Sequence, residues 1–313
     1  MLLVTGSTGF VGRALLPRLA QTGHETETRV LLRPSRHTPR LPKGIPVQVA
    51  ISALEDERGL RTALVGVDTL IHLAGAEWHG VKGDLLGVDA QGTRALVEAA
   101  QAAGVSRILY LSHLGADRAS AYPVLKVKGL AEEFIRQSGI PYTILRAAML
   151  YGPEDVFVNV IAALLKMGPG VFLMPGDGAI TLQPLWVDDL VTCLEWSLGE
   201  QAGLNQTLEL GGPEFITFAQ MVDLLSEVLK VRRIVIPTRQ PFLRWGANLM
   251  EYVLPRSPLT SRWLDYLAIS RTCELTSLTR YFGLKPTRFI PSTLSYLHEK
   301  NWFSEIARLI SAT

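Results

Sequence analysis

Short apolar runs alternate with longer stretches of helical periodicity through the first half of the chain. The runs are apolar at successive positions, which is typical of parallel strands covered on both faces, and the stretches between them carry one apolar face each. The pattern predicts βαβ units and a doubly wound α/β sheet of the Rossmann type. The predicted strands are 1–5, 28–32, 46–50, 68–75, 107–112 and 142–146, and the predicted helices are 12–21, 92–103 and 129–137.

The pattern changes after Tyr151. A helix is predicted at 157–167, returning strands within about 180–212, and mainly helical structure from Phe218 onward, where prolines recur. We therefore expect a dinucleotide-binding domain at 1–152, completed by the returning strands. A smaller, mainly helical C-terminal substrate or cap region is expected at 153–179 and 213–313.

Composition narrows the class of protein. The chain of 313 residues is 48% hydrophobic and 19% charged, which predicts a globular protein, and a net charge of +2 without a basic run argues against nucleic acid as a partner. Cys193 and Cys273 form no metal-binding pattern, so no metal is expected. The chain shows neither a signal peptide nor a membrane-spanning run, which favours a cytoplasmic protein; peripheral membrane contact stays open.

A glycine-rich turn follows the first predicted strand. In "VTGSTGFVG", Gly6 permits a tight turn, Gly9 lets the backbone approach a pyrophosphate, and Gly12 lets the helix pack closely on the strand. The helix N-terminus offers free N–H groups to the anion. The segment therefore predicts a dinucleotide site made by Gly6, Ser7, Thr8, Gly9, Phe10, Val11 and Gly12.

Arg33 ends the second predicted strand, where an NAD-specific protein usually carries an acid for the ribose hydroxyls. A guanidinium there suits the 2′-phosphate of NADP, and Arg36 lies close enough to share this role. The alternative is a pair of solvated loop arginines. We expect NADP as the cofactor, with NAD as the alternative.

Longer motifs resemble the extended and atypical branches of the short-chain dehydrogenase/reductase superfamily, which includes epimerase/dehydratase-like proteins. They are "TGSTGFVG", "VDTLIHLAGA", "VDAQGTRALVEAAQAAGVSRILYLS", "YTILRAAMLYGP" and "PLWVDDL". The second half looks most like the subgroup that includes the nucleotide-binding accessory subunit of respiratory complex I. The resemblance implies cofactor-side or active-site positions for Leu73, Ala74, Gly75 and Ser112. Asp89 departs from the asparagine that many relatives carry.

The family's active members use a tyrosine and a lysine four residues later. Tyr122 and Lys126 have this spacing, but the family's helix pattern after the lysine fits "KGLAEEFI" when the lysine is Lys128, which puts Val124 at the tyrosine position. The apolar stripe at 127, 130, 131, 134 and 135 agrees with that alignment. Three interpretations stay open: Lys128 as a cofactor ligand without a catalytic tyrosine, Tyr122 acting as catalytic acid from a loop beside Pro123, or a structural helix face.

Ser112 ends a predicted strand and is either a hydroxyl partner for a carbonyl substrate or a local turn former. His113 is a candidate to replace a second serine, or else makes a structural hydrogen bond. Asp188 and Asp189 precede an apolar periodic run and are predicted to cap a helix. The segment 241–255 predicts an amphipathic helix that packs on the core or contacts a membrane or partner subunit.

Two functions follow. The first is an NADP-dependent oxidoreductase or epimerase, with Ser112, Tyr122 and Lys128 as catalytic candidates, that acts on a carbonyl or alcohol of an unidentified small molecule. The alternative is a non-catalytic nucleotide-binding subunit, assembly factor or redox sensor, because a cofactor that binds only the folded chain stabilises it without any chemistry.

Overall fold

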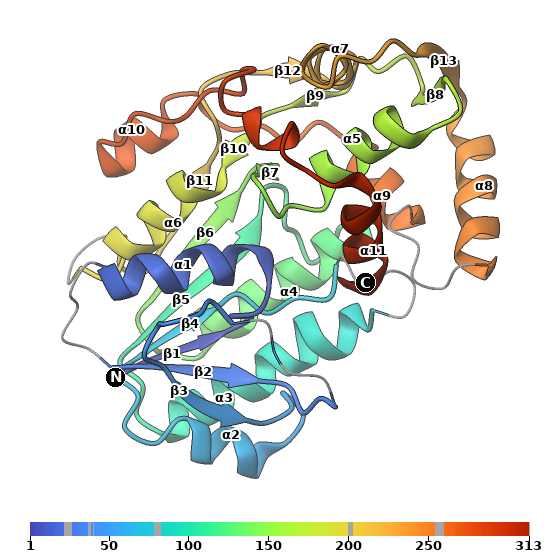
Figure 1. Cartoon of the computed structure of the whole chain (residues 1–313). Helices are drawn as coiled ribbons and strands as arrows, with labels where there is room; N and C mark the ends of the chain where they lie inside the picture. The colour runs from blue at the N-terminus through green and yellow to red at the C-terminus, as the bar shows by residue number, and fades with distance from the viewer. Residues whose placement is uncertain are drawn as a thin grey trace.

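A parallel sheet forms the centre of the molecule (Figure 1). The computed structural model describes residues 1–21, 27–36, 39, 41–77, 83–199, 203–253 and 260–312. Side by side, the strands of the sheet are β11 (Gln206–Leu210), β6 (Tyr142–Ala147), β5 (Arg107–His113), β4 (Thr69–His72), β1 (Leu2–Thr5), β2 (Thr28–Leu32) and β3 (Gln48–Ile51). The predicted doubly wound parallel sheet is thereby confirmed.

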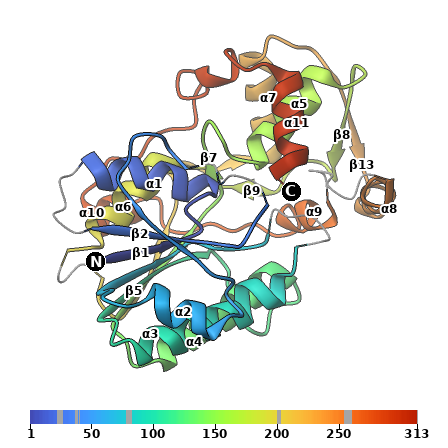
Figure 2. The ribbon, with the colours of Figure 1, turned by 60° about the horizontal axis from the view of Figure 1, so that its bottom comes forward.

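Helices cover both faces of this sheet, as Figure 2 shows. One layer holds α1 (Phe10–Gln21), α6 (Val187–Trp196) and α10 (Ser277–Phe282), and the other holds α2 (Glu57–Ala63), α3 (Thr93–Ala102) and α4 (Pro123–Gln137). Successive strand residues point to opposite faces. Val4 therefore packs with Leu15 of α1, whereas Leu3 packs with Leu60 and Leu96 of the other layer.

The strand order reverses direction between β1 and β4. From β1 the chain continues to β2 and β3 on one side, whereas β4, β5 and β6 extend the sheet on the other side. In doubly wound sheets, ligands bind beyond the carboxyl ends of the strands at such a reversal. The fold thus brings the glycine turn after Thr5 and the segment after His72 to one place.

Beyond the central sheet lie three short strand pairs and the helices of the expected C-terminal cap. The pairs are β7 (Leu150–Tyr151) with β10 (Leu185–Trp186), β9 (Thr181–Leu182) with β12 (Ile216–Thr217), and β8 (Val171–Pro175) with β13 (Ile234–Thr238). The helices are α5 (Phe157–Met167), α7 (Phe218–Val228), α8 (Gln240–Val253), α9 (Ser261–Tyr266) and α11 (Trp302–Ala312), with a 3-10 turn at Ser295–Leu297. Phe157 stacks on Trp263 with ring centroids 5.2 Å apart, so aromatic side chains from distant segments meet in the core of the cap.

The acids at the start of α6 do not cap it, so that prediction is wrong. The N-cap is Trp186, which makes no side-chain cap hydrogen bond. Asp189 instead accepts hydrogen bonds from the backbone N–H of Thr287 at 2.6 Å and from its hydroxyl at 3.1 Å. Asp188 accepts one from the Trp186 indole. The acid pair therefore anchors a distant segment rather than the helix itself.

Candidate functional site

The glycine turn is held by contacts that exclude a side chain at two positions. Gly6 has φ = 69°, and a Cβ there would lie 2.6 Å from the backbone of Leu73 and Ala74. A Cβ on Gly12 would lie 2.3 Å from the Gly6 carbonyl oxygen. The first N–H groups of a helix have no partner within it. The turn therefore presents the start of α1 to the crevice as an anion-binding concavity.

Ser7 provides a second indication of a ligand at this turn. Its side chain is fully buried, and its Oγ finds no hydrogen-bond partner among the residues that the structure describes. A buried hydroxyl without a partner is costly, and a bound phosphate would satisfy it. The geometry of the turn therefore fits a pyrophosphate.

The segment after β4 joins the glycine turn to the interior of the site. The backbone N–H of Ala74 donates to the Thr5 hydroxyl at 3.3 Å, and the N–H of Ala76 donates to Asp89 at 2.8 Å. A Cβ on Gly75 would lie 2.9 Å from the Asp89 carboxylate and 3.3 Å from the Lys128 ammonium. The predicted positions Leu73, Ala74 and Gly75 thus lie between β1 and a buried ion pair.

This ion pair joins Lys128 and Asp89, whose Nζ and Oδ1 lie 2.9 Å apart. Both side chains are buried, whereas Lys126 on the opposite side of α4 is exposed. Burial would lower the pKa of Lys128, but the Asp89 carboxylate raises it above its ordinary value, so the ammonium stays charged. Asp89 lies in a π-helical turn, Leu86–Gly92, a conformation found frequently at functional sites.

Tyr122 lies at the N-cap of α4 in an extended conformation, and Pro123 is the first helical residue. The Tyr122 backbone N–H donates to Ser120 Oγ at 3.2 Å, and its side chain is half-buried. Val124 occupies the position one helical turn before Lys128 and packs partly buried beside Val127. The helix therefore carries no hydroxyl at that position, and a catalytic role for Tyr122 stays a prediction.

Ser112 belongs to a buried cluster beside α4. Its hydroxyl donates to the Glu132 carboxylate at 2.6 Å, and Glu132 also accepts hydrogen bonds from Arg136 and Arg146. The next residue of β5, His113, points to the opposite face of the sheet, as strand alternation requires. His113 lines a cavity, so the geometry places its side chain, rather than that of Ser112, at the open end of β5.

Glu77, which no sequence motif marks as a functional residue, is the partner of His113. The Nε2 atom of His113 lies 2.6 Å from the Glu77 carboxylate. Burial would raise the pKa of Glu77, but His113, Lys128 and Arg271 together lower it to about 2, so this carboxylate is ionised. An ionised carboxylate only accepts hydrogen bonds, so Nε2 carries a hydrogen. His113 Nδ1 is buried and has no hydrogen-bond partner in the described part of the chain.

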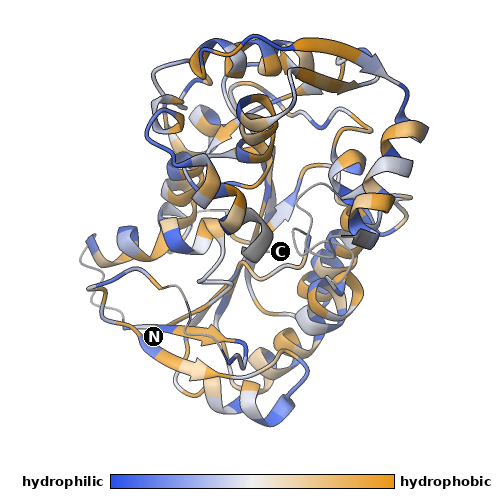
Figure 3. Cartoon of the chain, turned by 45° about the vertical axis from the view of Figure 1, so that its right-hand side comes forward, coloured by the Kyte–Doolittle hydropathy of each residue, from blue (hydrophilic) through white to orange (hydrophobic). Residues whose placement is uncertain are grey.

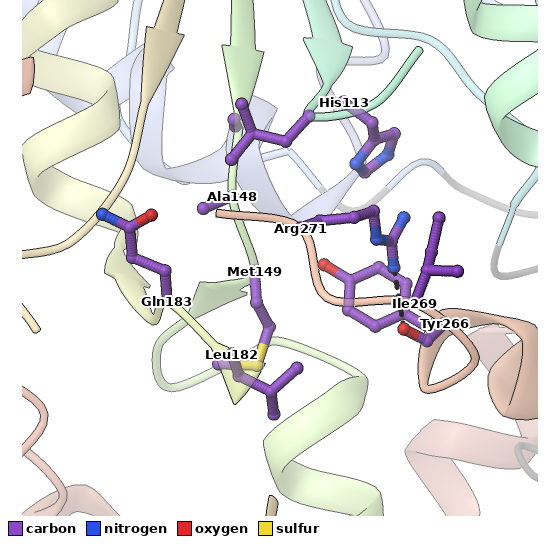
Figure 4. Close-up of a pocket in the computed structure, with 10 residues that line it drawn as sticks. His113, Ala148, Met149, Leu182, Gln183, Tyr266, Ile269 and Arg271 are labelled. Atoms are coloured by element: carbon purple, nitrogen blue, oxygen red, sulfur yellow. Dashed lines mark hydrogen bonds between the residues drawn. The ribbon is translucent and has the colours of Figure 1, made fainter. Parts of the chain in front are cut away.

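The cavity beside His113 lies where the sheet meets the cap. Figure 4 shows His113, Arg271 and Tyr266 on one side of it and Gln183 on the other. The Arg271 guanidinium lies 3.8 Å from the centre of the Tyr266 ring and donates to the Tyr266 carbonyl oxygen. The remaining lining is apolar and comprises Leu114, Ala147, Ala148, Met149, Leu182 and Ile269. The cavity is small, with a volume of about 10 Å³, which is the space of one water molecule.

Arg33 directly follows β2 at the same edge of the sheet, and its side chain is exposed, as is that of Arg36. No group of three or more His, Cys, Asp or Glu side chains in the described ranges is arranged to hold a metal ion. The residues at this edge therefore offer N–H groups, hydroxyls and cations, which are the groups that bind a phosphorylated dinucleotide.

Comparison with known proteins decides the family. A family model described as NAD(P)H-binding matches residues 6–166, which include the glycine turn, the Lys128 pair and His113. The chain belongs to the NAD(P)H-binding family. This confirms that it is an NAD(P)H-binding protein of the atypical short-chain dehydrogenase/reductase type, as its motifs predicted.

Relatives of this NAD(P)H-binding protein have several assigned roles. It is 28% identical over 233 residues to NADH dehydrogenase (ubiquinone) 1 alpha subcomplex subunit 9, mitochondrial, of Arabidopsis thaliana, covering 72% of the chain but only 57% of that relative. It is 36% identical over 338 aligned positions to sterol demethylase protein B of Methylococcus capsulatus, covering 97% of the chain and 98% of the relative. The NADPH complex of the NADPH-dependent quinone oxidoreductase QOR2 from Escherichia coli shares the fold, with a TM-score of 0.74 and 21% identity over 94% of the chain and 99% of that structure.

Proposed function

We propose that the protein is an NADP(H)-dependent oxidoreductase that interconverts a ketone and a secondary alcohol on a hydrophobic, lipid-sized molecule. The observation that carries the proposed proton transfer is the His113–Glu77 pair at the carboxyl end of β5, close to the buried Lys128. A relative that matches along nearly its whole length is named for sterol demethylation, which favours a sterol or similar lipid.

The cofactor would be held by the glycine turn and by the cation that follows β2. The N–H groups at the start of α1 and the Ser7 hydroxyl would bind the pyrophosphate, and Arg33 would bind a 2′-phosphate. Lys128 would donate hydrogen bonds to the ribose next to the nicotinamide. The bound nicotinamide supplies or accepts the hydride.

His113 would move the proton. With Nε2–H held by Glu77, Nδ1 is the nitrogen left to exchange a proton with the substrate oxygen. Nδ1 accepts the hydroxyl proton when an alcohol is oxidised, and Nδ1–H returns it when a ketone is reduced. The ionised Glu77 keeps the ring oriented in both directions, as an acid does for a catalytic imidazole.

A second function is favoured by Val124. Active members of the superfamily carry a tyrosine there, and a valine side chain exchanges no proton. If His113 does not replace the tyrosine, the bound nucleotide serves a non-catalytic subunit, as expected from the similarity to a respiratory-complex subunit. Tyr122 acting from the N-cap of α4 is the remaining catalytic alternative.

Isotope transfer separates these possibilities. The protein is incubated with NADPH deuterated at nicotinamide C4 and a panel of 3-ketosterols and long-chain ketones, and the product alcohols are analysed by mass spectrometry. We expect deuterium in at least one alcohol. His113→Gln should lower kcat at least about 100-fold with NADPH affinity unchanged, because it removes the proton donor but not the nucleotide contacts.

Matched variants identify the group that acts. His298→Gln changes an exposed histidine of the cap and should leave kcat unchanged. A large loss in Tyr122→Phe, with His113→Gln still active, would move the proton donor to Tyr122. Tight NADPH binding without deuterium transfer to any member of the panel would contradict the enzymatic proposal and favour the non-catalytic function.

A further inference from the structure

Helix α8 turns an apolar stripe away from the molecule. Phe242, Trp245, Leu249 and Tyr252 recur at helical spacing, and their exposed fractions are 67%, 70%, 49% and 86%. Leu243, on the other side of the helix, packs on the core of the cap. The helix is therefore anchored by one face while its aromatic face is left in solvent, at the edge of the molecule in Figures 1 and 2.

The preceding strand extends this exposed surface. Ile234, Val235 and Ile236 of β13 are 68%, 38% and 44% exposed, and Leu173 of the paired strand β8 is 52% exposed. Figure 3 shows this apolar strand pair at the top of the molecule. Isolated exposed apolar residues are ordinary, but a run along one strand and the next helix marks an interaction surface. We call residues 234–252 the α8–β13 face.

The charge around this face is positive. From residue 230 to residue 252 the chain carries five cations and one acid, a net charge of +4, whereas the whole chain carries +2. The cations are Lys230, Arg232, Arg233, Arg239 and Arg244, and the acid is Glu251. Arg244 is paired with Asp265 of α9, whereas Lys230, Arg232 and Arg239 are exposed. The rest of the chain therefore carries a net charge of −2, and the segment that contains the exposed aromatic stripe carries the excess of positive charge.

Aromatic residues beside cations match the interface of an anionic lipid bilayer. Tryptophan and tyrosine prefer the headgroup level, aliphatic side chains enter the acyl boundary, and nearby lysines and arginines are attracted to anionic headgroups. None of the helices in the described ranges has the length and apolarity that a spanning segment needs. The face is thus suited to lie on a membrane rather than to cross one.

We propose that the α8–β13 face docks the protein on the surface of a membrane that contains anionic lipids. The ion pair between Arg244 and Asp265 fastens α8 to α9, and Tyr266 at the end of α9 lines the cavity beside His113. Docking would therefore place the wall of that cavity next to the lipid surface. The docking itself does not depend on the proposed redox chemistry.

Sedimentation with lipid vesicles tests this proposal on the intact protein. Vesicles of phosphatidylcholine alone are compared with vesicles that also contain phosphatidylglycerol, at low and at high salt. We expect at least about tenfold stronger binding to the anionic vesicles at low salt, and weaker binding at high salt, because the exposed cations are screened. Equal binding to both kinds of vesicle, or to neither, would contradict the proposal.

Matched variants show whether this face is responsible. Phe242→Ser combined with Trp245→Ser should weaken binding about tenfold or more, without changing the thermal unfolding midpoint. The control combines Ile51→Ser and Val65→Ser, which remove side chains that are 68% and 66% exposed on β3 and after α2. Equal losses in both double variants would overturn the assignment. A second copy of the chain would be the occupant of this face if two results came together. The wild type would form a dimer in analytical ultracentrifugation without binding vesicles, and only the Phe242 and Trp245 double variant would abolish that dimer.

Discussion

The glycine turn at Gly6 and Gly12 packs through close backbone contacts, whereas the cap around Phe157 packs through contacts between aromatic side chains. The glycine turn lies against the backbone of Leu73, directly after β4, with no room for a Cβ on Gly6. The cap is organised by ring contacts such as Phe157 with Trp263, between segments about a hundred residues apart. We propose that the first region holds the dinucleotide, whereas the second contributes Tyr266 to the wall of the cavity beside His113.

This difference determines how each region responds to substitution. A backbone contact cannot be relieved by changing a rotamer, so one added methyl group at the turn forces the chain to move. In the cap, a side chain on an outer face is replaced without disturbing any neighbour. We therefore expect single substitutions at the glycine turn to abolish dinucleotide binding. Substitutions on the outer face of α8 should instead weaken the proposed membrane contact.

The largest effect is expected for Gly12→Ala. The new Cβ would lie 2.3 Å from the Gly6 carbonyl oxygen and 2.6 Å from Ser7 Cα, so α1 must move away from the turn. NADPH affinity, measured by fluorescence titration, should fall at least about 100-fold, or ~2.7 kcal/mol. Gly246→Ala in α8 is the control, because a Cβ there meets nothing within 4 Å. An affinity within twofold of the wild type would show that the turn does not hold the cofactor.

Arg33→Ser should have a smaller and selective effect. The exposed guanidinium is proposed to bind only the 2′-phosphate, so NADPH affinity should fall about tenfold, or ~1.4 kcal/mol, with NADH affinity nearly unchanged. The measurement is a pair of titrations on the wild type and the variant. Parallel losses for both nucleotides would mean that Arg33 supports the turn rather than selecting the phosphate. Equal wild-type affinities would contradict the NADP preference.

The first region was largely readable from the sequence because its determinants are local. The glycine spacing predicted the turn, and the periodicity of α4 predicted an apolar face at 127, 130, 131, 134 and 135. Of these residues Val127, Ala131 and Ile135 are buried, whereas Leu130 and Phe134 are half-buried. The same periodicity put Lys126 and Lys128 on opposite sides, as the structure shows. The proposed roles of these lysines stay predictions.

The remaining features depend on residues that meet only in the folded chain. Glu77 contacts His113, which is 36 positions away in the sequence, and Asp89 contacts Lys128, which is 39 positions away. No spacing rule predicts either pair. The capping prediction for Asp189 was wrong for the same reason, because Thr287 arrives from 98 positions away and donates two hydrogen bonds to it. Local propensity favoured Asp189 as a helix cap, but its carboxylate binds the distant Thr287 instead.

The smallest predicted effect concerns His72, which lies beneath the site at the end of β4. Its ring nitrogens lie 2.6 Å from the Thr5 hydroxyl and 2.9 Å from that of Thr93. Burial, and then the charge of Lys128, lowers its pKa to about 3, so the folded chain holds it neutral. The unfolded chain binds a proton near the ordinary pKa of about 6.5, so this residue makes the folded state less stable as the pH falls below that value.

Between pH 7.5 and pH 6.0 this linkage should cost about 0.8 kcal/mol of the free energy of unfolding. Urea unfolding at both pH values measures the loss in the wild type, and the loss should be smaller by about that amount in His72→Gln. His298→Gln, an exposed histidine of the cap, provides the comparison. If His72→Gln lost as much stability as the wild type between pH 7.5 and pH 6.0, His72 would not be the titrating group and this account would be wrong.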